Sequence, residues 1–232
     1  MAEAELDNPV WAALTGPHRR FAERHGGAAR YQPDVAPFLA VSSPDAWPDV
    51  AALVDPGAVV VAAGVPVPPD WTVVDEIPGV QLVDAGVVAA PYPEAVRLTA
   101  VDVPEMLDLV ARTQPGPFRE RTIELGTYLG VRHEGRLVAM AGERLHPPGW
   151  TEISAVCTDP AHRGQGLATA LVRALVAVIR ARGEQALLHT VATNTGAIRL
   201  YESLGFRVRA KPLFTAVRVP ATDLLPTGEA AG

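Results

Sequence analysis

Apolar residues recur at two different spacings along the chain, and the spacing separates helices from strands. From residue 166 to 182, leucine, isoleucine, valine and alanine return every three or four positions, and Gly183 follows. This pattern predicts an amphipathic helix that ends at the glycine. Shorter apolar runs, typical of buried strands, occupy residues 127–132, 136–145, 151–158 and 185–192.

The connections between the first three of these strands predict how they pair. His133-Glu134-Gly135 and Pro147-Pro148-Gly149 are short turn sequences, so the strands that they join should form an antiparallel meander. The other elements expected are helices at 102–113 and 195–204 and strands at 95–100, 206–210 and 213–219. We therefore predict an α/β fold with a mixed, mainly antiparallel central sheet that is flanked by helices.

The amino-terminal part of the chain has a weaker pattern. Strands are expected at 35–42 and 58–63 with a helix at 46–54 between them, and a hairpin is expected to turn at Pro78-Gly79. Pro91-Tyr92-Pro93 resists both helix and central strand, and we place a boundary there. The predicted parts are a smaller α/β region (1–93), the main domain (94–220) and a flexible tail (221–232). Residues 1–93 are interpreted as substrate-side structure or as a degenerate copy of the main fold.

Composition narrows the class of protein. The chain has 26 acidic and 20 basic residues and no run of Lys or Arg, so nucleic acid is not expected as a partner. One cysteine and six dispersed histidines predict neither an intrachain disulfide nor a metal site. The acidic start and the lack of a long apolar run predict a cytoplasmic protein with no membrane partner. A homodimer is left open.

A glycine-containing loop lies between a predicted strand and the long helix. Its sequence is Arg163-Gly164-Gln165-Gly166-Leu167-Ala168-Thr169. Unpaired backbone N–H groups and the helix dipole favour an anion at such a position, and glycines let the main chain approach a pyrophosphate. The alternative is a strand-to-helix turn that binds nothing.

This loop resembles the pyrophosphate-binding motif of the GCN5-related N-acetyltransferase (GNAT) family, written [Arg or Gln]-x-x-Gly-x-[Gly or Ala]. The similarity continues upstream into Val156-Cys157-Thr158-Asp159-Pro160 and covers roughly residues 95–219, most specifically 143–206. It includes features of the glycine N-acyltransferase-like branch. Downstream, the family's Asn-x-x-Ala-x-x-x-Tyr-x-x-x-Gly-Phe ending is matched by Asn194, Ala197, Tyr201, Gly205 and Phe206.

The resemblance implies a co-substrate, acetyl-CoA, and a place for it. The two central strands should separate so that pantetheine lies between them, and an amine should attack the thioester directly, without a metal. Cys157 is interpreted as a packed side chain and not as a nucleophile. The residues expected to bind the co-substrate are Val156, Cys157, Thr158, Arg163, Gly164, Gln165, Gly166, Leu167, Ala168, Thr169, Asn194, Ala197 and Tyr201.

Direct attack requires a neutral amine, so a base must accept a proton. Strand alternation places Glu152 on the face of Val156 unless a bulge intervenes, which makes Glu152 the first candidate base. Glu143 is the second and His189 the third. Either carboxylate could instead be a solvated or salt-bridged sheet residue, and His189 could be a packed core residue. Tyr201 is the candidate acid for the departing thiolate, or else it only packs.

The predicted function is therefore N-acetyl transfer from acetyl-CoA to an unidentified amine. One alternative is a catalytically silent acyl-CoA-binding sensor, and the other is a protein Nα- or lysine acetyltransferase. The presence of Tyr201 and of two candidate carboxylates favours an enzyme over a sensor.

Overall fold

The computed structural model describes residues 3–63 and 65–220. Within these residues, a nine-stranded sheet has the order β4-β12-β5-β10-β9-β8-β7-β6, and β11 pairs with β5. Its strands are β4 (Val59–Ala63), β5 (Thr72–Asp84), β6 (Val96–Arg97), β7 (Tyr128–His133), β8 (Arg136–Glu143), β9 (Trp150–Thr158), β10 (Gln185–Val191), β11 (Phe206–Ala210) and β12 (Leu213–Arg218). The tail predicted at 221–232 lies outside the described residues.

Helices cover both faces of this sheet. α2 (Val103–Thr113) packs on β8 and β9 from one side, whereas α3 (Leu167–Ala181) packs on the other side and is followed by α4 (Thr195–Leu204). Short 3-10 segments are η4 (Ala100–Asp102), η5 (Thr122–Leu125) and η6 (Pro160–His162). β7, β8 and β9 form the predicted antiparallel meander, while β10 runs parallel to β9. The mixed α/β fold class is confirmed.

The amino-terminal residues build a second, smaller unit. A described three-stranded antiparallel sheet contains β1 (Ala22–His25), β2 (Ala28–Tyr31) and β3 (Leu39–Val41), with η1 (Glu3–Leu6), α1 (Pro9–Thr15), η2 (Arg19–Phe21) and η3 (Pro44–Ala52) around it. Trp47 and Trp71 pack together at its core, with ring centroids 5.0 Å apart. A parallel bridge from Phe38 to Val61 connects this unit to β4.

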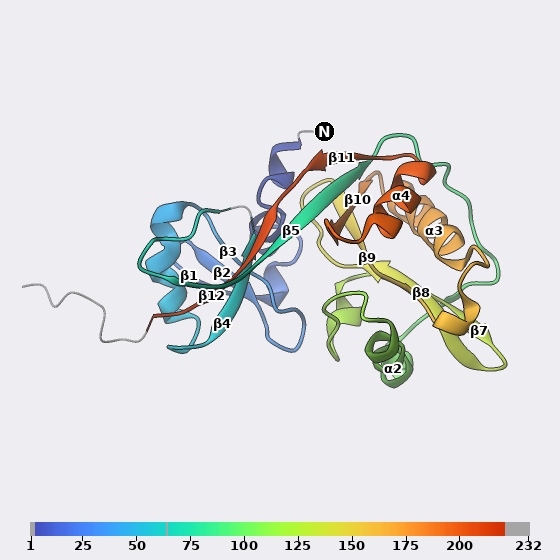
Figure 1. Cartoon of the computed structure of the whole chain (residues 1–232), viewed down its shortest axis with the longest axis horizontal. Helices are drawn as coiled ribbons and strands as arrows, with labels where there is room; N and C mark the ends of the chain where they lie inside the picture. The colour runs from blue at the N-terminus through green and yellow to red at the C-terminus, as the bar shows by residue number, and fades with distance from the viewer. Residues whose placement is uncertain (1–2, 64, 221–232) are drawn as a thin grey trace, which may run out of the picture.

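The sheet is continuous across the boundary predicted at 93/94. β5 pairs with β12 through residues 72–78 and with β10 through 79–83, so an amino-terminal strand is inserted among carboxyl-terminal ones. Conversely, the carboxyl-terminal β12 pairs with the amino-terminal β4. Figure 1 shows β5 running between the two parts of the molecule. No described helix has the length and apolar character needed to cross a membrane.

The predicted hairpin at Pro78-Gly79 is wrong, because β5 passes straight through both residues. Pro78 stands where the strand changes partners, and its carbonyl accepts a hydrogen bond from the Ala192 N–H at 2.8 Å. A Cβ on Gly79 would lie 2.3 Å from the Phe214 ring. The glycine therefore makes room for an aromatic side chain instead of forming a turn.

Candidate active site

The central strands separate as predicted. β9 and β10 pair in parallel only from Trp150 to Ile153 on one strand and from Gln185 to Leu188 on the other. Beyond these residues, a cavity of about 520 Å³ opens between residues 153–158 of β9 and residues 189–191 of β10. The exposed backbone edges along this gap can pair with an extended ligand.

A β-bulge in β9 changes which side chains face the cavity. Ala155 has φ of 51°, and the register moves from Met140 opposite Cys157 to Gly142 opposite Ser154, so β9 has one residue more than β8. As a result, Ile153 and Val156 pack toward the same side, against the core under α3. The expectation that Glu152 shares a face with Val156 is wrong, because the bulge reverses the alternation between them.

The glycine loop has the geometry expected of an anion site. Gly164 and Gly166 both have φ of 77°, and a Cβ at either position would meet no atom within 4 Å. Helix α3 begins at Leu167 with no side-chain cap on Gly166 among the described residues. Over the described part of the chain, the N–H groups of residues 166–169 have no backbone partner. They point out of an exposed helix terminus, where a phosphate is favoured.

Some of the residues expected to bind the co-substrate line the cavity and others do not. Residues 164–169 of the glycine loop lie outside the lining. Arg163, just before them, is part of the lining, and its Nε donates to the Thr158 carbonyl at 3.3 Å. Asn194 also caps α4 by accepting from the Ala197 N–H at 3.2 Å. Those that line the cavity are Val156, Cys157, Thr158, Arg163, Asn194, Ala197 and Tyr201.

Tyr201 and Cys157 are both buried in the cavity wall. Burial, with a further contribution from Cys157, raises the pKa of Tyr201 to about 12, so its phenol keeps its proton at neutral pH. Burial also raises the pKa of Cys157, which keeps the thiol protonated and a poor nucleophile. This arrangement offers a proton donor at Tyr201 and a packed thiol at Cys157.

Glu152 is fully buried and forms an ion pair. Its carboxylate accepts from Arg144 at 2.9 and 2.6 Å and lies 2.8 Å from His189 Nδ1. Burial by itself would raise the pKa of Glu152, but the charge of Arg144 and the contact with His189 lower it well below its usual range. Glu152 does not line the cavity, whereas both of its partners do.

Glu143 is also buried, with two hydrogen-bond donors on its carboxylate. Its carboxylate accepts from the Thr127 N–H at 3.0 Å and from Arg182 at 3.0 Å. It is not part of the lining of either cavity. Its oxygens thus connect the β7–β8 edge to the end of α3, and its role as the second candidate base stays a prediction.

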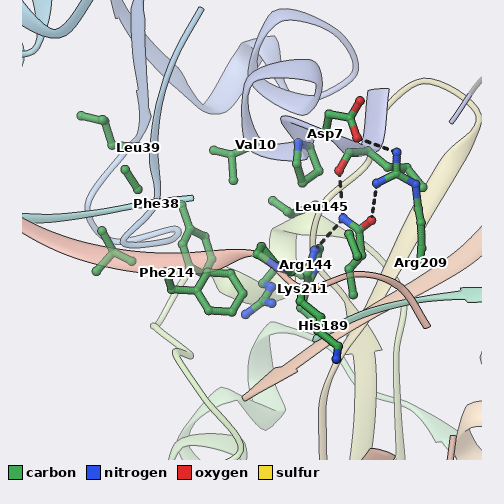
Figure 2. Close-up of a pocket in the computed structure, with 17 residues that line it drawn as sticks. Asp7, Val10, Phe38, Leu39, Arg144, Leu145, His189, Arg209, Lys211 and Phe214 are labelled. Carbon is green, nitrogen blue, oxygen red and sulfur yellow. Dashed lines mark hydrogen bonds and ion pairs between the residues drawn. The ribbon is translucent and has the colours of Figure 1, made fainter. Parts of the chain in front are cut away.

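A second cavity, of about 300 Å³, lies between the amino-terminal unit and the sheet (Figure 2). Arg144 and His189 line both cavities, as do Phe38, Val61 and Phe214. The two spaces therefore share a wall, and the ion pair of Glu152 lies behind it. The acceptor of an acyl transfer needs such a space beside the co-substrate.

Hydrogen-bond directions fix the tautomer of His189. Arg209 can only donate, so the Gln81 carbonyl oxygen faces it at 2.8 Å and the Gln81 amide nitrogen donates to His189 Nε2 at 2.9 Å. The ring hydrogen is therefore on Nδ1, where it is donated to Glu152. Arg144 completes the chain by donating to the same carboxylate.

Sequence reasoning missed several of these residues. Arg144 could have been found, because the meander places it across the hairpin from Glu152, and the Arg144 N–H donates to the Glu152 carbonyl at 2.9 Å. Gln81 and Phe38 carry no such local signal. They reach the site only because β5 and the Phe38–Val61 bridge cross from the amino-terminal part.

Comparison with known proteins gives the class of this fold. The family described as FR47-like protein matches residues 128–215. A GNAT-family protein of known structure from Novosphingobium aromaticivorans DSM 12444 is 40% identical with a TM-score of 0.86, over 93% of this chain and 99% of that one. The fold and this match place the chain among acetyltransferases. It belongs to the GNAT family.

Two curated relatives match a shorter segment. A mycothiol acetyltransferase from Thermobispora bispora is 44% identical over 82 residues, which are 35% of this chain and 27% of that protein. The N-alpha-acetyltransferase RimI of Mycobacterium tuberculosis is 39% identical over 83 residues, which are 34% of this chain and 51% of the relative. The match therefore spans between about a quarter and a half of these relatives' length.

Proposed function

We propose that the protein transfers an acetyl group from acetyl-CoA to the amine of a small molecule by direct attack on the thioester. The observation that carries this proposal is the gap between β9 and β10, which opens beside an exposed glycine loop at the start of α3. The loop N–H groups suit the pyrophosphate, and the gap suits the pantetheine arm. The other residues that the motif resemblance assigns to the co-substrate, such as Thr158 and Asn194, are proposed to contact it as well.

In this proposal, β9 stabilises the thioester oxygen, and Tyr201 protonates the departing thiolate. The bulge leaves Ala155 and Val156 outside the paired register with β8, so the Val156 N–H can donate to the thioester oxygen as negative charge develops there. The amine nitrogen forms its bond to the carbonyl carbon as the carbon–sulfur bond breaks. The thiolate then takes the phenolic proton of Tyr201.

We assign the proton of the amine to His189 and not to Glu152. A carboxylate whose pKa is lowered by Arg144 is a weak proton acceptor at neutral pH. His189 lines both cavities, and its Nε2 can take a proton when the amine displaces the Gln81 amide. Glu152 then acts as a positioning residue that holds the ring through its contact with Nδ1.

The second cavity favours a small acceptor over a protein. Its volume of about 300 Å³ is at the lower end for small-molecule sites, and amino-terminal residues such as Leu6 and Phe38 form part of its wall. The relatives' names include both kinds of acceptor, a mycothiol acetyltransferase and an N-alpha-acetyltransferase. The glycine N-acyltransferase-like branch also remains part of the proposal, on the motif pattern of residues 143–206 alone.

A thiol-release assay with acetyl-CoA and a panel of amines tests this function. We expect release that depends on the amine and a mass increase of one acetyl group on that amine. Binding of CoA without release for any amine would identify a silent acyl-CoA sensor. Release with a peptide amino terminus or a peptide lysine, but with no small amine, would identify a protein acetyltransferase.

A further inference from the structure

The second cavity has walls of two different kinds. In Figure 2, apolar side chains including Leu39, Phe38 and Phe214 gather on one side of the view, whereas Arg209, His189 and other polar side chains gather on the opposite side. A ligand that fills this space must therefore be amphipathic, with an apolar body and a polar group.

The cations of the polar wall are not all neutralised by the protein. Arg209 is fully engaged, with Gln81, Asp7 and Glu3 as its partners. Arg144 uses its Nε and Nη2 atoms for Glu152, and its Nη1 atom has no hydrogen-bond partner among the described residues.

Lys211 is the third cation of this wall and the only lysine in the chain. It has no ion pair or hydrogen bond with any residue that the structure describes. A guanidinium edge and an ammonium group can both donate to an anion, and a charge-assisted bond of this kind is stronger than a neutral one. The polar wall is therefore suited to an anionic group.

The apolar wall limits the size of the ligand. Phe38, Leu39, Val10, Leu145 and Phe214 surround a space of about 300 Å³, which is enough for one compact aromatic or branched group. The Arg144 guanidinium lies 4.9 Å from the centroid of the Phe38 ring, so the charged and apolar walls meet there.

We propose that this cavity binds the acyl acceptor and selects a primary amine that carries an anionic group beside a compact apolar body. The anion binds Arg144 and Lys211, the apolar body lies against Phe38 and Phe214, and the amine reaches the wall at His189 that the two cavities share. The selection of an acyl acceptor rests on the proposed function, whereas the binding of an anion in the cavity does not rest on it.

Chemical labelling of Lys211 tests the binding site without any turnover. The protein is treated with an amine-reactive reagent, and peptide mapping by mass spectrometry separates Lys211 from the terminal amine. We expect 3-phenylpropionate or 2-phenylethyl phosphate to slow labelling of Lys211, and the neutral 3-phenylpropanamide to have no effect. If only one of the two anions slows the labelling, the result shows whether the site prefers a carboxylate or a phosphate. Equal labelling with and without both anions would overturn the proposal.

A comparison of two acceptors then tests selection. The ratio of kcat/KM for L-phenylalanine to that for L-phenylalaninamide is measured in the wild type, in Lys211→Gln and in Arg136→Gln. Arg136 is exposed and lines neither cavity, so its variant controls for net charge. Using the ratio within each variant cancels the difference in amine basicity between the two acceptors.

We expect Lys211→Gln to lower this ratio by about tenfold, since it removes one charge-assisted hydrogen bond, and Arg136→Gln to leave it unchanged. Turnover with an unaltered ratio in Lys211→Gln would overturn the inference while keeping the proposed function. Protection of Lys211 with no turnover of any amine would instead overturn the proposed function and keep the anion site.

Discussion

Over the residues that the structure describes, the two halves of the chain repeat one order of elements, but only the carboxyl-terminal half places a glycine loop between its third strand and the helix that follows. In the amino-terminal half, the meander β1-β2-β3 is followed by η3 and by β4, whose Val61 forms a parallel bridge with Phe38, the residue before β3. In the carboxyl-terminal half, the meander β7-β8-β9 is followed by α3 and by the parallel strand β10. In each half, the last of these strands pairs in antiparallel fashion with a strand of the other half, β4 with β12 and β10 with β5.

The connections at corresponding places differ in their chemistry. Between β9 and α3, residues 159–166 include two glycines with positive φ. Between β3 and η3 lie only Ser42 and Ser43, and Pro44 at the helix start has no N–H to offer an anion. Trp47 and Trp71 pack in the core beside this turn. We infer that the repeated order supplies a scaffold, and that the glycine loop gives the carboxyl-terminal half its ligand.

The shared order supports the interpretation of residues 1–93 as a degenerate copy, which stays a proposal. The same residues also form one wall of the second cavity, so a substrate-side role is compatible with it. The difference between the halves leads to four predictions.

The largest effect is expected at the buried charge beside the gap in the carboxyl-terminal half. Glu152→Gln leaves Arg144 buried without its partner, and the free energy of unfolding should fall by about 3–5 kcal/mol. Urea denaturation measures this change. Glu124→Gln is the control, because its ion pair with Arg121 is exposed and should matter little. Unchanged stability, with a turnover that recovers as pH rises, would restore Glu152 as the base.

The second effect concerns catalysis at the gap. Tyr201→Phe should lower kcat by 10- to 1,000-fold, about 1.4–4 kcal/mol in the activation barrier, with CoA affinity nearly unchanged. Because burial raises the pKa of Tyr201 to about 12, the acid should stay protonated through pH 10. Its ionisation should therefore be absent from the wild-type pH profile below that value. A parallel loss of CoA affinity would mean that Tyr201 mainly packs.

The third and smallest effect is expected in the amino-terminal half. Burial, with smaller contributions from His146 and Arg20, lowers the pKa of His18 from 6.5 to about 3. Below pH 6.5 the unfolded chain binds a proton at His18 that the folded chain does not, so stability should fall as pH drops toward 3. The expected slope is up to about 1.4 kcal/mol per pH unit.

Thermal or urea unfolding between pH 7 and 4.5 measures this slope, at pH values above the titration of Glu152. His18→Gln should reduce the slope but not remove it, because burial also lowers the pKa of His146, whereas the same change at the exposed His25 should not reduce it. A profile that keeps its slope in His18→Gln would mean that another group of the molecule controls the acid response.

Local patterns in the sequence predicted the parts of the fold that depend on local interactions. The helix at 167–181 and the meander follow from apolar spacing and short turns, and the structure confirms them. The bulge at Ala155 and the straight path through Pro78-Gly79 could not be read in the same way. Both are set by partners distant in sequence, namely β8 beside the bulge and Phe214 against Gly79.

The candidate site was predictable to a similar extent. The loop and Tyr201 belong to a recognisable motif, and the structure places Tyr201 in the cavity wall. The choice of base depended on a strand face that the bulge changes. The tautomer of His189 depends on Gln81, which reaches it through the exchange of β5 between the halves. No pattern within one segment contains that information.

The most direct test compares two glycines at opposite ends of α3 by calorimetric titration with CoA. Gly166 and Gly183 have φ of 77° and 78°, and a Cβ at either position meets no atom within 4 Å, so Gly166→Val and Gly183→Val impose matched backbone strain. Only Gly166 lies in the loop assigned to the pyrophosphate. We predict that Gly166→Val abolishes CoA binding in a folded protein and that Gly183→Val binds CoA like the wild type. Wild-type affinity in Gly166→Val, or equal loss in both variants, would contradict the assignment of the loop and of the gap beside it.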